Sequence, residues 1–151
     1  DRLPEPIGDY HYGNGRFIPV SKAELHGKWR TGKVGRELLP TGGIRSTYES
    51  YDLLHSDRVG DSLRIEFTGK AIGAFILAGP DAGFLSSSID GESLSLHDLY
   101  HRYSRKLNYP RSVIFAAELS PGKHLLELSV AAQTNAQSSG NAVNILFFEV
   151  N

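Results

Sequence analysis

The stretch that decides the fold runs from residue 63 to residue 91 and reads LRIEFTGKAIGAFILAGPDAGFLSSSIDG. Apolar and polar residues alternate over 63–68, the pattern of a strand with one face in the core and the other in water. Residues 71–78 are apolar on both faces, which predicts a central strand covered from two sides. Residues 84–89 predict a third strand that ends at an Asp90-Gly91 turn. Three strands without a helical period between them predict an antiparallel sheet.

The connections outside these strands complete the prediction. Thr68-Gly69-Lys70-Ala71 fits a hairpin turn, because Gly69 is free to adopt a positive φ. Residues 27–43 are glycine-rich and predict a long loop. Further strands are predicted, from alternation and turn residues, near 16–18, 47–54, 94–99, 113–119, 124–130 and 143–148. In the last of these, Val143, Ile145 and Phe147 are expected on one face.

These elements together predict an all-β fold. We expect a jelly-roll-like antiparallel β-sandwich of about eight strands, because short strands separated by turns recur along the chain. A single domain is expected over residues 1–151, with residues 1–9 as a linker or lead-in.

The composition sets bounds on function. The chain has 151 residues, 40% of them hydrophobic, and a formal net charge of −1. This length suits one domain with its own core, and a net charge near zero does not indicate nucleic-acid binding. The absence of cysteine excludes disulfides and thiol chemistry. No apolar run approaches the roughly 20 residues of a membrane span, so we expect no membrane span. From the net charge we expect no nucleic-acid partner.

Short letter patterns of a serine hydrolase occur in the chain. Gly60-Asp61-Ser62-Leu63 spells GDSL, the nucleophile block of the SGNH/GDSL esterases, and their D-x-x-H block occurs over 52–55 and over 98–101. In that family the nucleophile block lies at a turn from a strand into a helix, whereas here a strand over 63–67 follows it. The family's G-x-N-D block has no match. We therefore expect no catalytic residues, and a serine esterase using Ser62 is the least favoured alternative.

Several other blocks, taken together, resemble one kind of domain. They are residues 12–19 (YGNGRFIP), 67–73 (FTGKAIG), 79–83 (GPDAG), 88–91 (SIDG), 108–110 (NYP), 119–124 (LSPGKH) and 148–151 (FEVN). Their order and spacing resemble the C-terminal β-sandwich accessory domain of secreted bacterial SGNH/GDSL hydrolases. The resemblance implies a carbohydrate-binding-module-like jelly roll without catalytic residues of its own. It also implies a secreted or periplasmic protein whose partners are a polysaccharide or oligosaccharide and an SGNH/GDSL hydrolase catalytic domain.

The loop over residues 100–111 carries the mixture of side chains that a glycan site needs. Sugars have apolar C–H faces and polar rims, so their sites combine aromatic rings with hydrogen-bonding groups. This loop has four Lys/Arg residues and no carboxylate. That composition suits an acidic polysaccharide, such as a uronate or a sulfated glycan, whose carboxylate or sulfate groups bind arginine. The candidate ligand residues are Tyr100, Arg102, Tyr103, Arg105 and Tyr109. The alternative is a solvated loop whose tyrosines pack on the end of the sandwich.

Three further candidates lie elsewhere: Trp29, Arg30 and Asp81. Trp29, beside Arg30 in the glycine-rich loop, is either a stacking platform or a plug in the open end of the sandwich. Asp81 is either a ligand residue at the rim or a cap of its own turn. We expect no cofactor and no metal. A structural calcium ion is the less favoured alternative, because it needs about six oxygen ligands and Asp81, Asp90 and Asp98 are not spaced as a recognisable loop. The alternative to glycan binding is a structural domain that packs on the hydrolase domain or mediates oligomerisation.

Overall fold

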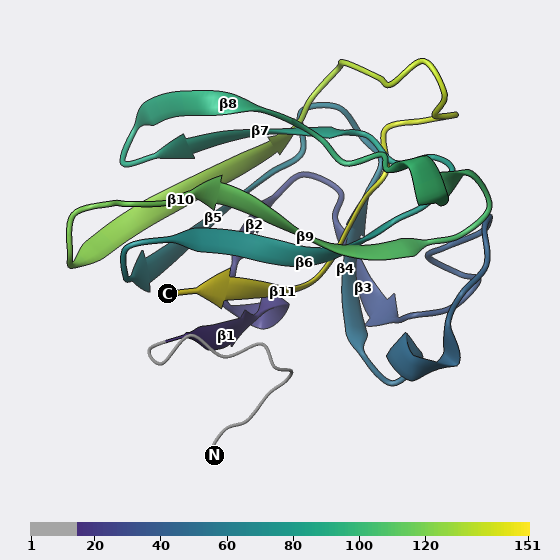
Figure 1. Cartoon of the computed structure of the whole chain (residues 1–151), viewed down its shortest axis with the longest axis horizontal. Coiled ribbons are helices and arrows are strands. Elements are labelled where there is room, and N and C mark those ends of the chain that lie inside the picture. The colour runs from purple at the N-terminus through teal and green to yellow at the C-terminus, as the bar shows by residue number, and fades with distance from the viewer. Residues whose placement is uncertain (1–14) are drawn as a thin grey trace.

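The computed structural model describes residues 15–151 and shows a sandwich of two antiparallel sheets (Figure 1). The strands are β1 (Arg16–Pro19), β2 (Glu24–His26), β3 (Arg30–Lys33), β4 (Asp52–Ser56), β5 (Ser62–Thr68), β6 (Ile72–Ala78), β7 (Phe84–Ile89), β8 (Glu92–Asp98), β9 (Tyr109–Ala116), β10 (Lys123–Val130) and β11 (Val143–Val150). Three short 3₁₀ helices, η1 (Val20–Lys22), η2 (Ser46–Tyr48) and η3 (Arg102–Arg105), accompany them. The all-β sandwich is confirmed, with eleven strands in the described residues rather than about eight. The lead-in predicted over residues 1–9 lies outside the described residues.

Strands that follow one another in the sequence often belong to different sheets. One sheet has six strands, in the order β3-β4-β11-β6-β9 with β1 also paired to β11, and the other has five, in the order β2-β5-β10-β7-β8. The segment 68–71 therefore carries the chain from β5 in one sheet to β6 in the other, and Gly69 does not have a positive φ. The hairpin predicted there is wrong, because alternation identifies a strand but not the sheet that the strand joins.

One predicted turn does close a hairpin, the Asp90-Gly91 turn between β7 and β8. Asp90 has φ 54° and Gly91 has φ 85°, and two successive positive φ values are the mark of the type I′ turns that suit two-residue hairpins. Beyond residue 91, β8 forms the edge of the five-stranded sheet.

The main core lies between the sheets, and β6 is buried on both faces as predicted. Ile72, Ala74 and Ile76 of β6 belong to the main core, whereas Phe75 and Leu77 belong to a smaller cluster on the outer face of the six-stranded sheet. The connection from β3 to β4 covers part of this outer cluster, because it contributes residues such as Leu38 and Leu39.

A β-bulge interrupts the alternation in β11. Its register with β6 shifts between Ile145 and Phe147, which leaves Leu146 as an extra residue. As a result Ile145 and Phe148 both lie in the main core, whereas Leu146 and Phe147 both lie in the outer cluster. The prediction that Phe147 shares a face with Ile145 is therefore wrong.

The first third of the described chain differs most from the prediction. Two strands, β2 and β3, were not indicated by the sequence, because almost all of their side chains are exposed and show no apolar alternation. β3 lies in the glycine-rich region that was predicted to be a loop. The strand predicted over 47–54 begins only at Asp52, after η2. Within the described residues no helix has the length and apolar character needed to cross a bilayer.

Candidate functional site

The connection from β8 to β9 lies at one end of the sandwich (Figure 1), and aromatic and basic side chains of this connection contact one another. His101 precedes η3 and caps it reciprocally: its Nδ1 accepts a hydrogen bond from the Tyr103 N–H at 3.2 Å, and its own N–H donates to Ser104 Oγ at 3.0 Å. Both ends of the cap are satisfied, which fixes this single turn. The turn holds the His101 ring against Tyr109, the first residue of β9, with ring centroids 4.4 Å apart and planes 19° apart.

Tyr103 and Arg102 complete this group, which we call the loop cluster (His101, Arg102, Tyr103 and Tyr109). The Tyr103 ring lies 5.2 Å from His101 and 5.3 Å from Tyr109, centroid to centroid. The Arg102 guanidinium lies 4.9 Å from the centre of the Tyr103 ring, and its Nη2 donates to the Tyr103 hydroxyl at 3.1 Å. This cation–π contact positions the arginine, while the residue Tyr103 remains 51% exposed.

The charges around the loop cluster are positive and unpaired. Arg102, Arg105 and Lys106 are all exposed, and none of them forms an ion pair within residues 15–151. The pKa of His101 is lowered, first by partial desolvation and then by the charges of Arg111 and Arg102. A neutral imidazole agrees with its role as acceptor in the cap. The loop therefore presents an aromatic ring beside cations that form no ion pair with a carboxylate of the described residues.

Two other residues of the same loop, the candidate Tyr100 and the neighbouring Arg111, serve its structure. Tyr100 is 8% exposed and belongs to the main core, so its ring is not presented to a ligand. Arg111 is half-buried, and its Nη1 donates to the carbonyl oxygens of Asp98 at 3.4 Å and Leu99 at 3.0 Å, which ties β9 to the end of β8. Of the predicted residues, the structure thus brings Arg102, Tyr103 and Tyr109 together.

Trp29, Arg30 and Asp81 do not join the loop cluster. Trp29 is half-buried against the main core, and its Nε1–H donates to the Ser62 carbonyl oxygen at 2.8 Å, an arrangement that matches the plug alternative. Arg30 is exposed and donates to the Glu37 carbonyl oxygen at 3.2 Å. Burial is the main reason that the pKa of Asp81 is raised, and a hydrogen bond from its own backbone N–H opposes the shift, as expected for a turn cap.

The hydrolase-like letters do not assemble into a catalytic arrangement in the described residues. Asp61 is buried and accepts a hydrogen bond from Ser56 Oγ at 2.7 Å, so it holds the turn before β5. His55 Nδ1 donates to Asn144 Oδ1 at 2.7 Å. No histidine within residues 15–151 hydrogen-bonds the hydroxyl of Ser62, which is the first residue of β5, whereas the strand was predicted to begin at residue 63. No group of three or more His, Asp or Glu side chains in the same range is arranged to hold a metal ion.

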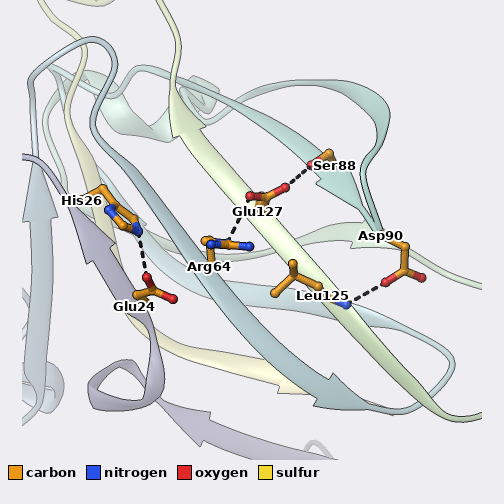
Figure 2. A network of polar contacts seen from close by, with 7 residues as sticks. All are labelled: Glu24, His26, Arg64, Ser88, Asp90, Leu125 and Glu127. Atoms are coloured by element: carbon orange, nitrogen blue, oxygen red, sulfur yellow. Dashed lines mark hydrogen bonds and ion pairs between the residues drawn. The ribbon is translucent and has the colours of Figure 1, made fainter.

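The exposed face of the five-stranded sheet carries a polar network that the sequence analysis did not single out (Figure 2). Arg64 Nε pairs with Glu127 Oε2 at 3.2 Å, and Ser88 Oγ donates to Glu127 Oε1 at 3.4 Å. On the neighbouring β2, His26 Nε2 pairs with Glu24 Oε2 at 3.0 Å. These groups border a shallow hollow of about 460 Å³. Their charges are satisfied within the sheet, in contrast to the cations of the loop.

A second surface that was missed lies on the outer face of the six-stranded sheet. We call it the aromatic groove, a hollow of about 780 Å³ bordered by Phe17, Tyr48, Tyr51, Phe75 and Phe147. Phe75 and Phe147 stack with centroids 5.2 Å apart and planes 10° apart. The groove could not be seen in the sequence because the bulge at Leu146 is what turns Phe147 outward.

The sandwich is similar to domains of carbohydrate-active enzymes. It matches a two-domain esterase active on acetylated mannans, co-crystallised with mannopentaose, over 99% of this chain and 39% of that one (TM-score 0.63, 12% identity). It matches a family two carbohydrate esterase from Cellvibrio japonicus over 90% of this chain and 32% of that one (TM-score 0.54, 12% identity). It also matches the CBM36-1 domain of a multidomain xylanase from the hindgut metagenome of Trinervitermes trinervoides over 91% of this chain and 97% of that one (TM-score 0.56, 14% identity).

These matches define a class of fold. The chain spans less than half of either esterase and nearly all of the separate CBM36-1 domain. No protein-family model and no curated protein sequence matches the chain. The chain has the carbohydrate-binding-module-like β-sandwich found in carbohydrate esterases and glycoside hydrolases, and the resemblance to the accessory domain of SGNH/GDSL hydrolases is confirmed as a likeness of fold.

Proposed function

We propose that this chain is a non-catalytic glycan-binding module and that its loop cluster binds an acidic polysaccharide. The observation that carries the proposal is the half-exposed Tyr103 ring with Arg102 lying against it, an arginine that forms no ion pair in the part of the chain that the structure describes. The similar esterase co-crystallised with mannopentaose and the similar CBM36-1 domain support glycan binding as the class of function.

Each member of the loop cluster, together with the exposed Arg105 of the same loop, has a part in this proposal. The exposed side of the Tyr103 ring stacks on the C–H face of a sugar. The guanidinium groups of Arg102 and Arg105 donate paired hydrogen bonds to a uronate carboxylate or a sulfate, for which their planar shape is suited. Tyr109 and His101 support Tyr103 from below by ring contacts. Because these cations are exposed, each ion pair contributes about 1 kcal/mol or less and is screened by salt.

The experiment is a calorimetric titration of the chain with oligogalacturonate, a sulfated oligosaccharide and a neutral oligosaccharide, at low and at physiological salt. We expect an acidic ligand to bind with an affinity that falls as salt is added. Tyr103→Ala should weaken that binding at least fivefold. Arg102→Gln removes one exposed ion pair and should weaken it by up to about fivefold at low salt. Arg58→Gln, which removes one exposed arginine outside the loop cluster, is the charge-matched control and should bind like the parent chain.

Two results would contradict the proposal. One is the absence of binding to every acidic ligand at low salt, and the other is an equal loss of affinity in Arg58→Gln, which would show only a general effect of charge. Either result would favour the structural alternative, in which the domain packs on a hydrolase domain. The non-catalytic part is tested separately, because acetyl-ester hydrolysis that disappears in Ser62→Ala would overturn it. Export together with an enzyme stays a prediction of the resemblance.

A further inference from the structure

A buried acid borders the aromatic groove with one oxygen that lacks a partner. Glu149 of β11 is 4% exposed, and its Oε2 accepts a hydrogen bond from Ser112 Oγ at 3.1 Å. Its Oε1 is buried and has no hydrogen-bond partner in the described structure. Burial raises the pKa of Glu149, and the Ser112 hydrogen bond only partly opposes this shift. Buried polar atoms in native proteins nearly always have partners, so this orphaned oxygen calls for an explanation.

The fold places this acid in the middle of the sheet face. Glu149 is paired in register with Gly73 of β6, and Ser112 lies on β9, the strand beyond β6. Because Gly73 has no side chain, the Glu149 side chain can lie across β6 and reach Ser112. The side chain of any other residue at position 73 would also collide with β9, since a Cβ there would lie 2.4 Å from the Val113 carbonyl oxygen.

The Glu149–Ser112 pair lies where two hollows meet. Both residues border the aromatic groove, of about 780 Å³, and both border a second hollow of about 460 Å³ around Gly73, Ile114 and Ala117. We call the two hollows together the trough. Its bordering residues include members of β11, β6 and β9, which are neighbours in the six-stranded sheet, so the trough crosses adjacent strands.

Among the described residues that border the trough, Asp52 and Glu149 are acidic and none is a lysine or an arginine. Asp52, at the rim, is paired with Lys33 through Oδ1 and Nζ at 2.8 Å, and burial raises the pKa of Glu149. Aromatic side chains such as Tyr51, which is 39% exposed, border the aromatic half. A site with aromatic rings, hydroxyl groups and a carboxyl has the chemistry to hold an uncharged sugar chain, and its described border has no cation that would attract an acidic one.

We propose that the trough is a second glycan site, which binds a neutral oligosaccharide independently of the loop cluster. One or more sugar rings lie on the aromatic side chains, and a sugar hydroxyl hydrogen-bonds with the Glu149 carboxyl and Ser112. The terminal torsion of a glutamate is soft, so its rotation turns the unpartnered oxygen toward the trough. A bound hydroxyl then supplies the partner that this oxygen lacks.

The test is a titration of the chain with neutral β-1,4-linked hexasaccharides of mannose, glucose and xylose. We expect at least one to bind, and we expect Tyr51→Ala to weaken it at least fivefold. Glu149→Leu, which keeps the volume and removes both hydrogen-bonding oxygens, should do the same. Because Tyr51 is partly exposed, Tyr51→Ala remains informative even where Glu149→Leu fails to fold.

Matched variants separate this proposal from that for the loop cluster. Tyr103→Ala should abolish binding of the acidic ligand and leave neutral binding unchanged, whereas Tyr51→Ala should do the reverse. The proposal is overturned if none of the three neutral hexasaccharides binds at millimolar concentration, or if binding is retained in both trough variants. It is also overturned if sedimentation shows a dimer that Tyr51→Ala dissociates, because the trough would then be a contact between copies of the chain.

Discussion

Trp29 offers a sharp test of whether an aromatic residue in this sandwich is structural or serves a ligand. Its indole packs against the main core, and its Nε1–H donates to the Ser62 carbonyl oxygen at 2.8 Å, which fastens the start of β3 to the start of β5. Trp29→Phe removes this donor and keeps most of the packing. We therefore expect a loss of stability without any loss of glycan affinity.

The size of the effect follows from this geometry. A single hydrogen bond contributes about 0.5–1.5 kcal/mol net, and a carbonyl left partly buried without its donor adds to that, so Trp29→Phe should cost about 1–2 kcal/mol. For a chain of 151 residues, an unfolding entropy near 2 cal/mol/K per residue converts this into a fall in Tm of about 3–6 °C. Trp29→Ala also loses ring packing and should cost about 2–4 kcal/mol, below the full range for a buried ring because the side chain is half-buried.

Unfolding in urea is monitored by far-UV circular dichroism and not by tryptophan fluorescence, because both variants remove the only tryptophan. Tyr103→Phe is the control: it removes a hydroxyl from an exposed ring and should change stability by less than about 0.5 kcal/mol. The account is refuted if Trp29→Phe is as stable as the parent chain. It is equally refuted if Trp29→Ala keeps its stability and loses glycan affinity, because Trp29 would then be a stacking platform.

Two further predictions concern the turns. His124 donates from Nδ1 to Asp90 at 2.6 Å and from Nε2 to the Ser120 carbonyl oxygen at 2.7 Å, and these acceptors, Asp90 first, raise its pKa. The stabilisation from His124 is therefore complete below its unfolded pKa of about 6.5 and is lost as pH rises through its folded pKa. His124→Gln should lower Tm at pH 6 and match the parent at pH 9, whereas a difference in Tm that does not depend on pH would contradict this. Gly91 has φ 85° with open space around its Cβ position, so Gly91→Ala should cost about 1 kcal/mol in urea unfolding through backbone strain alone, and an unchanged midpoint would contradict the type I′ turn.

Most strands from β4 onward could be read from the sequence, whereas β2, β3 and the assignment of the strands to sheets could not. Alternation over 63–68 and the apolar run over 71–78 locate β5 and β6 to within one residue. That β5 pairs with β10, more than fifty residues away, depends on long-range packing that a local pattern does not contain. The bulge in β11 escaped for the same reason, because it is defined by the partner strand and not by the letters around Leu146.

The candidate site was predictable in composition but not in geometry. The absence of acids and the density of tyrosine and arginine indicated the loop over 100–111. Which side chains face solvent depends on the reciprocal cap between His101 and Ser104, and Tyr100, one residue earlier, turns into the core. Nothing in the sequence around Glu149 indicated a buried acid, because its burial depends on Gly73 in another strand.

The measurement that tests the central claim most directly is a heteronuclear NMR titration of the chain with an acidic oligosaccharide at low salt. The account predicts shift changes centred on residues 101–109, with the largest at Arg102 and Tyr103. The polar face around Arg64 and Glu127, whose charges pair with each other, should remain unchanged. Unchanged spectra, or shift changes confined to that polar face, would contradict the claim that the loop cluster binds an acidic glycan.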